Sequence, residues 1–322
     1  MSHAATWGVV STIKAPAQAI LDFAAHHLDL GAHRLHLYLD EPNPEVFPHL
    51  KAHPKIRVTT CDDQHWSRRK TARPKKHQVR QTLNATHAYG RIQTDWIAHI
   101  DVDEFLCPQP VGSDGLADPL PLGQMLAALP PEQMATRVRP IEALPDRTGC
   151  FKAMVPRGPE RIRKTREIYP RYGHHLAGGF LSHTAGKVIA RTGLPDIEFR
   201  IHNLFQNGIV CPTTPELTGV DLCHFHAPSW DSWQKLHSFR LRRGSYRAEL
   251  KPSVLGKRDA INTHDLLTQI IAESGDDGLR SFYDELHAVD SQVFDRLQAA
   301  GLIRHRSLDL NRKRRKHFPG FD

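Results

Sequence analysis

The chain has 322 residues, a mass of 36.4 kDa and a formal net charge of +8. No apolar run approaches the roughly 18–20 residues that span a bilayer, which argues against a membrane-spanning protein. The five cysteines are scattered without a C-x-x-C pair, which argues against a disulfide framework and a cysteine-rich zinc site. The basic surplus favours an anionic partner, and the first residues, MSHAATWGVV, lack a charged leader, which predicts a cytoplasmic protein.

The first hundred residues alternate between short apolar runs and helical patterns. We predict strands over residues 6–13, 34–42, 55–63 and 96–106, with helices over 17–31 and 76–89. This alternation predicts an α/β fold with a mainly parallel sheet and helices on both faces. Because ligands bind beyond the carboxyl ends of such strands, the acids that follow them should meet at one edge: Asp40, Asp62, Asp63, Asp101 and Asp103.

From Cys107 onward the pattern changes, beginning with a proline- and glycine-rich loop over 107–123. We then predict a helix over 124–129, a strand over 134–141, a basic irregular segment over 157–172, paired strands over 186–192 and 197–204, a strand over 220–227, a serine-capped helix over 229–244 and helices over 262–300. The predicted organisation is one domain over 1–250, with a nucleotide-binding half (1–106) and an acceptor and metal half (107–250), followed by a helical extension with a basic tail over 251–322.

The stretch WIAHIDVDEFL places Asp101, Asp103 and Glu104 at the end of an apolar run. Such close carboxylates repel, so a positive partner should accompany them. A Walker B strand is excluded because no G-x-x-x-x-G-K-[ST] loop precedes it. A glycosidase pair fits poorly, because two acids separated by one residue in extended backbone point to the same side. A shared Mg²⁺ or Mn²⁺ ion, which offsets charge on a departing diphosphate, fits this spacing best.

The pattern W-x-x-x-x-D-x-D-E-F, together with GKVIARTG, RIHNL and LCHFHAPSWDSWQKL after it, resembles the GT-A glycosyltransferases. The narrower resemblance is to a family 2-like bacterial group, and it covers roughly residues 5–250. It implies a GT-A-like sheet with a helical C-terminal segment and a metal-dependent transferase. The sugar would move from a nucleoside diphosphate donor, expected to be UDP-linked, to a saccharide or lipid-linked acceptor, with inversion at the anomeric carbon.

The resemblance also implies roles for single residues. Asp40 corresponds to the acid that binds the nucleobase, Asp101 to the acid on the ribose and metal side, and Asp103 to a direct metal ligand. A further ligand is expected from HFH, either His224 or His226, and relatives favour His224. The predicted donor-binding set is completed by basic and hydroxyl side chains: Thr12, Lys76, Arg80, Lys187 and Arg191. An inverting enzyme needs a base near the acceptor, for which Asp196 is the first choice before Glu198 and Asp231.

Two other classes remain as alternatives. Basic runs over 68–76 and 311–318 suggest a nucleic-acid-binding protein, although no recognised nucleic-acid motif accompanies them, so we expect no specific nucleic acid partner. The histidines suggest a metal-dependent phosphohydrolase, but several histidine and aspartate ligands for two metals cannot be assembled from the sequence. The run over 311–318 is expected to be either a solvated tail or a peripheral contact with an anionic membrane.

Overall fold

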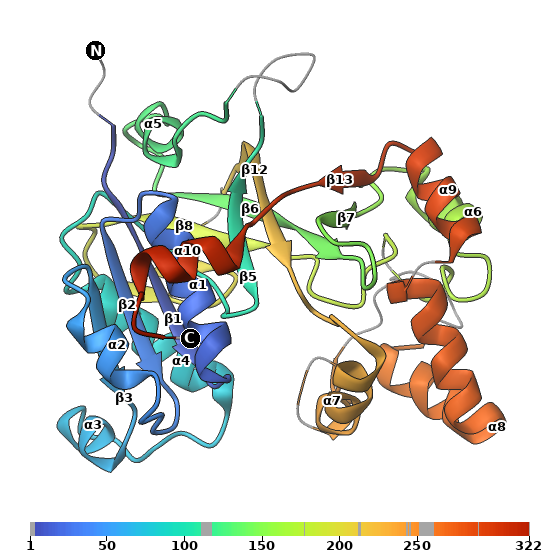
Figure 1. Ribbon diagram of the computed structural model, residues 1–322, viewed down its shortest axis with the longest axis horizontal. Helices are drawn as coiled ribbons and strands as arrows, with labels where there is room; N and C mark the ends of the chain where they lie inside the picture. Colours follow the sequence, from blue (N-terminus) through green and yellow to red (C-terminus); the bar gives the residue numbers. More distant parts are fainter. Residues whose placement is uncertain are drawn as a thin grey trace. The chain divides into compact units, whose positions relative to one another are not determined.

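The computed structural model describes residues 4–110, 118–176, 178–211, 214–242, 244, 246–250, 261–288 and 290–321. The chain forms two compact units (Figure 1). Unit 1 comprises residues 1–139, 185–222 and 308–322, and unit 2 comprises residues 140–184 and 223–307. The predicted boundary after residue 250 falls beside residues 251–260, which lie outside the described residues, so it stays a prediction. Residues 111–117 of the predicted loop also lie outside them.

Unit 1 is built on a mixed sheet with the strand order β6-β8-β4-β1-β2-β3, and β12 pairs with β5 and β6. Its strands are β1 (Trp7–Ile13), β2 (Arg34–Leu39), β3 (Ile56–Thr60), β4 (Trp96–His99), β5 (Glu104–Pro108), β8 (Lys187–Arg191), and most of β6 (Ala135–Ala143) and β12 (Glu216–His224). Its helices are α1 (Ala17–Asp29), α2 (Phe47–Ala52), α3 (Asp63–Arg68), α4 (His77–Tyr89), α5 (Leu122–Ala127) and α10 (Leu310–His317). β3, β2, β1 and β4 run parallel, and β8 runs antiparallel to β4 and β6. The predicted α/β fold class is confirmed.

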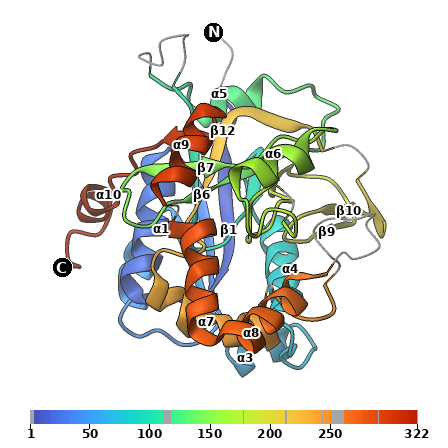
Figure 2. The same ribbon diagram turned by 90° about the vertical axis from the view of Figure 1, so that its right-hand side faces the viewer.

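Strand β1 lies at the centre of the parallel part, and all seven of its residues are buried. A short run that is apolar on both faces is expected for a parallel strand covered on both sides. Figure 2 shows β1 with α1 on one side and α4 on the other. The apolar positions that predicted α1 are buried against the sheet, and the helix stops where Gly31 adopts a left-handed φ of 97°.

The predicted strand over 96–106 is interrupted, which corrects the sequence prediction. β4 ends at His99, the chain turns at Val102 and Asp103, and β5 begins at Glu104. The turn is closed by two hydrogen bonds: the Glu104 N–H donates to the Asp101 carbonyl (3.1 Å), and the Asp101 N–H donates to the Glu104 carboxylate (2.9 Å). The acidic motif is therefore a turn between two strands, and its acids are not aligned along extended backbone.

The predicted pairing of 186–192 with 197–204 is wrong. β8 is inserted between β4 and β6, where four of its five residues are buried. The following residues turn away through left-handed conformations at Gly193 and Asp196. They lead into a separate three-stranded sheet of order β11-β10-β9, formed by β9 (Ile197–Phe199), β10 (Leu204–Gln206) and β11 (Ile209–Val210).

Unit 2 is mainly helical, as predicted for residues 262–300. It contains β7 (Cys150–Ala153), β13 (Ile303–His305), α6 (Arg161–Ile168), α7 (Trp230–Arg242), α8 (Thr263–Tyr283), the π-helical turn η1 (Asp284–Ala288) and α9 (Ser291–Ala299). Helix α6 corrects the irregular segment predicted over 157–172. Trp233, Tyr246 and Phe282 lie in the apolar core of this unit, and the predicted serine cap of α7 is present, because the Ser232 N–H donates to Ser229 Oγ (3.2 Å).

The basic run over 311–318 forms helix α10, which lies along α1 in unit 1 (Figure 1). Arg314 forms an ion pair with Asp22, the Lys316 ammonium lies 2.6 Å from Asp29, and the Phe318 side chain is buried. The run is therefore a docked helix and not a solvated tail. No described helix has the length and apolar character needed to cross a membrane.

Candidate active site

The predicted acids gather at the carboxyl edge of the parallel strands. Asp40 follows β2 and its N–H donates to the carbonyl of Ile13 at the end of β1 (2.8 Å), which shows that the two strands end at the same level. Asp62 follows β3 and caps α3 by accepting from the His65 N–H (2.8 Å), and Asp101 follows β4. The topology therefore places these acids where ligands bind in parallel sheets.

The positive partner that the acidic turn requires is a lysine. Lys187 Nζ lies 2.5 Å from one carboxylate oxygen of Asp101 and 3.4 Å from Glu104, and Gln81 donates to the other Asp101 oxygen (2.6 Å). The Lys187 side chain is 1% exposed and that of Asp101 33% exposed. Burial lowers the pKa of Lys187, but the attraction of Asp101 and Glu104 outweighs it and the net pKa is raised. Lys187 is therefore a charged ammonium ion at neutral pH.

Glycine is required immediately before Lys187. Gly186 has a φ of 73°, and a Cβ at this position would collide with the carbonyl oxygen of Val138 on β6. A residue without a side chain thus allows β8 to approach β6 closely at its first residue. This close approach fixes the start of β8, and with it the position from which Lys187 reaches the acidic turn.

A second ion cluster surrounds Asp40, whose side chain is 2% exposed. Arg80 donates to both of its carboxylate oxygens (2.7 and 2.6 Å), Arg73 lies 3.3 Å away and His77 lies 3.6 Å away. Burial raises the pKa of Asp40, but the hydrogen bonds from His77 and Arg80 outweigh it and hold the pKa below its usual value. Asp40, predicted to bind the nucleobase, and Arg80, predicted to bind the donor, are thus bound to each other.

Thr12 is buried on β1, where its hydroxyl accepts from Asn84 Nδ2 (3.1 Å). A hollow of about 370 Å³ opens beyond the ends of β1 and β2, and Thr12 is not part of its lining. It is lined by residues 13–16 together with Leu39, Glu41, Pro42 and Asn43. This volume is in the range of small-molecule sites. Lys14 and Glu41 carry opposite charges on its lining and lie 2.6 Å apart.

Two predicted residues lie at the other end of the strands. Arg191 pairs with Trp96 at the start of β4, stacks over its ring at 4.4 Å and donates to the Gln133 carbonyl (3.1 Å). Asp196 is exposed on the turn after β8 with a φ of 55°. This turn is bound to the last residue of α4, because the Leu194 N–H donates to the Tyr89 hydroxyl (3.2 Å). Neither residue is brought together with Asp101. Lys76, by contrast, is exposed at the start of α4.

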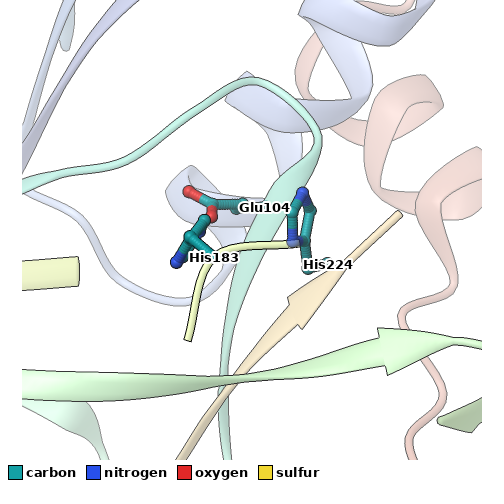
Figure 3. Close-up of side chains that lie close together, drawn as sticks. All are labelled: Glu104, His183 and His224. Carbon is teal, nitrogen blue, oxygen red and sulfur yellow. The ribbon is translucent and has the colours of Figure 1, made fainter. Parts of the chain in front are cut away.

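Glu104 of unit 1, and His183 and His224 of unit 2, each offer one side-chain atom of a type that binds metal ions, and Figure 3 shows these side chains. The strand that carries His224 pairs with the strand that carries Glu104. A carboxylate and two imidazoles suit Mn²⁺ or another transition ion better than Mg²⁺, which prefers oxygen ligands throughout. The chemistry of these side chains therefore suits a divalent ion.

His226, the other histidine considered from the sequence, has a different environment. Its Nε2 is 2.8 Å from the Tyr246 hydroxyl and its carbonyl accepts from Arg240 (2.7 Å). Burial lowers its pKa well below the usual value.

Sequence reasoning missed Gln81, Glu104 and His183 as site residues. Glu104 had a signal in the D-E-F motif, whereas Gln81 and His183 had none.

Comparison with known proteins gives one family match. The sequence model of glycosyltransferase family 92 matches residues 10–118, about a third of the chain. No curated protein sequence matches the chain.

Among solved structures, similarity extends to a mycobacterial protein, with 13% identity over 58% of this chain and 53% of that chain and a TM-score of 0.31. It extends to HddC from Yersinia pseudotuberculosis, with 11% identity over 73% of this chain and 99% of that chain and a TM-score of 0.30. It also extends to the glycosyltransferase GlyE from Streptococcus pneumoniae TIGR4, with 12% identity over 94% of this chain and 54% of that chain and a TM-score of 0.30. The chain thus spans about half the length of the mycobacterial protein. The family match supports a glycosyltransferase, an enzyme that uses a sugar donor and an acceptor.

Proposed function

We propose that this protein is a metal-dependent glycosyltransferase that moves a sugar from a nucleoside diphosphate donor, UDP-linked in the first instance, to a saccharide or lipid-linked acceptor. The observation that carries the proposal is the partly buried, ion-paired acidic turn at the carboxyl edge of a parallel sheet. The segment matched by family 92 includes this turn and Asp40. Neither alternative class gains a supporting observation.

In this proposal the nucleoside lies in the hollow beyond β1 and β2, whose lining includes Leu39 and Glu41 on either side of Asp40 in the chain. The diphosphate lies toward the acidic turn, where Lys187 offsets part of the carboxylate charge. Asp101 is oriented by Gln81 and Lys187 and faces the ribose. Inversion stays a prediction from the resemblance. Asp196 stays the proposed base, and it would act from the turn after β8, at the opposite end of the strands from Asp101.

We propose that Asp103, Glu104, His183 and His224 hold the divalent ion. Bound there, the ion supplies charge neutralisation for the departing nucleoside diphosphate. The two imidazoles make Mn²⁺ the preferred ion over Mg²⁺.

The first prediction is that UDP raises the melting temperature only when Mn²⁺ is present. A ligand that binds the folded state at a hundred times its Kd stabilises it by about 2.7 kcal/mol, which a thermal-shift measurement resolves easily. Mg²⁺ should give a smaller rise than Mn²⁺ at the same concentration. An equal rise with UDP and excess chelator would contradict the metal-dependent site.

The second prediction distinguishes the metal ligands from the other acids of this edge. Asp103→Asn keeps the shape of the side chain but removes its charge, so the Mn²⁺-dependent rise with UDP should disappear while the protein stays folded. His224→Ala should have the same effect, and His226→Ala a smaller one. Asp63→Asn is the matched control, because Asp63 is exposed at the start of α3 on the same edge and should leave the rise unchanged. If Asp103→Asn behaves like Asp63→Asn, Asp103 is not a ligand.

A further inference from the structure

The positive charge of this protein is concentrated in one segment. Residues 64–94 hold eight Lys and Arg and no Asp or Glu, a surplus as large as the net charge of +8 of the whole chain. The segment contains most of α3, the connection that follows it and all of α4. The basic run over 311–318, by comparison, has acidic partners on α1, with Arg314 bound to Asp22 and Lys316 to Asp29.

Three cations of the segment hold the connection between α3 and α4 in place. Arg69 stacks over Tyr38 (5.6 Å) and donates to the Leu83 carbonyl (3.1 Å). Arg73 donates to the Asp40 carbonyl (2.8 Å), and Arg80 donates to the carbonyls of residues 74 and 75 (2.8 and 3.0 Å). The backbone that carries the remaining cations is therefore fixed by the core of unit 1.

The cations carried by this backbone are exposed, and Lys75 and Lys76 lie within four residues of an exposed aliphatic side chain, Val79. On α4, Val79 and Leu83 are 43% and 36% exposed, one helical turn apart and therefore on one side of the helix. We call the following exposed side chains the α3–α4 surface: Arg68, Lys70, Lys75, Lys76, Val79 and Leu83.

We propose that the α3–α4 surface binds an anionic lipid surface, with its cations at the lipid phosphates and its two aliphatic side chains in the interfacial layer. Cations beside exposed aliphatic groups are the combination that peripheral membrane contact requires. A nucleic acid offers phosphates but nothing for Val79 and Leu83 to contact. The segment also presents no aromatic platform for bases, because Trp66 and Tyr89 are buried. The inference concerns binding alone and does not depend on the proposed enzymatic activity.

The test is co-sedimentation of the full chain with two kinds of vesicle, pure phosphatidylcholine and phosphatidylcholine with about 30% phosphatidylglycerol. We expect binding to the anionic vesicles only, and loss of binding when salt is raised from about 0.1 M to about 1 M. Arg68→Ser with Lys75→Ser should weaken the partition roughly thirtyfold, since each cation near such a surface contributes about fivefold. Val79→Ser with Leu83→Ser should weaken it as well, without changing the net charge.

Matched controls exist within the same unit. Lys51→Ser with Lys55→Ser removes two exposed cations elsewhere, and Ile209→Ser with Val210→Ser removes two exposed aliphatic groups elsewhere. Both control pairs should bind like the native protein, and circular dichroism should show that every variant is folded. The proposal would be overturned if the protein bound neutral and anionic vesicles equally, or if the control variants lost as much vesicle binding as the variants of the α3–α4 surface. So would the absence of vesicle binding combined with duplex DNA or heparin binding that depends on Arg68 and Lys75, because the surface would then recognise polyanions.

Discussion

Lys187 is the residue on which the acidic turn depends. Its ammonium group is buried with Asp101 and Glu104, and the Glu104 side chain is 0% exposed. A buried carboxylate is tolerated only when a cation or several donors compensate for the lost solvation. The lysine therefore has a structural role at this site whether or not substrate is bound.

The third prediction follows for Lys187→Met, which keeps most of the length of the side chain but removes the charge. It leaves Glu104 buried without its cation and should lower the free energy of unfolding by about 3–5 kcal/mol. Lys55→Met, at an exposed position, should change it by less than about 0.5 kcal/mol. Urea unfolding at neutral pH measures both. A loss below about 1 kcal/mol would mean that Lys187 does not compensate the turn.

At this scale the sequence predicts residue types better than residue partners. The D-x-D-E-F pattern identifies the acids and the need for a positive group near them. It cannot identify Lys187 as that group, because the pairing spans 86 positions and depends on where β8 enters the sheet. Asp40 and Arg80 are both predicted site residues, but nothing in the local sequence indicates that their side chains bind each other across 40 positions.

At the scale of elements, α10 shows how a charged segment becomes part of a folded unit. Six of its eight residues are basic, yet it packs on α1 because α1 offers Asp22 and Asp29 as ion-pair partners. The Asp22 and Arg314 side chains are each only 12% exposed, so their pairing is shielded from solvent.

The fourth prediction concerns this helix pair. Arg314→Met leaves Asp22 partly buried without its partner and should lower the free energy of unfolding by about 1–3 kcal/mol. Arg315→Met removes the same charge from the adjacent exposed position and should have almost no effect. Denaturant unfolding of both variants measures the difference, and equal effects would show that α10 contributes only through its overall charge.

The order of strands and helices over residues 6–99 is predictable because it depends on local periodicity, as in β1 and α1. Pairing is not local. β8 and β9 are close in sequence and each has a strand pattern, but the left-handed turn at Gly193 and Asp196 sends them into different sheets. The break at Val102 and Asp103 is local, but apolar periodicity does not predict it, since its closing hydrogen bond uses the side chain of Glu104.

Across the whole molecule, buried and half-buried histidines make stability depend on pH. Desolvation lowers the pKa of His26, His36 and His87 to about 4, and that of His99 and His287 to about 3. The unfolded chain takes up these protons near pH 6.5, whereas the folded chain does so only near the lowered values. Between these values the unfolded state binds more protons, so stability falls as the pH is lowered.

The fifth prediction is a steep loss of melting temperature between pH 6.5 and pH 4. Each buried histidine should contribute about 1.4 kcal/mol of destabilisation per pH unit over its own range. His26→Gln retains a donor for the Leu106 carbonyl, to which His26 Nε2 is 2.8 Å distant, and should reduce the slope by one proton. A melting temperature that stays constant from about pH 7.5 to about pH 5 would contradict the neutral, buried state of these side chains.

The packing of α10 on α1 also has a consequence during synthesis. Arg314 is 292 residues from Asp22 in the chain, so α1 leaves the ribosome long before the helix that covers it. At about 5–20 residues per second, that interval lasts roughly 15–60 s. Throughout it, Asp22 and the surface that later covers Phe318 are open to water and to other chains. A nascent chain that stops before residue 310 therefore presents an α1 without its covering helix, and the carboxylate of Asp22 lacks its cation until the last residues are made.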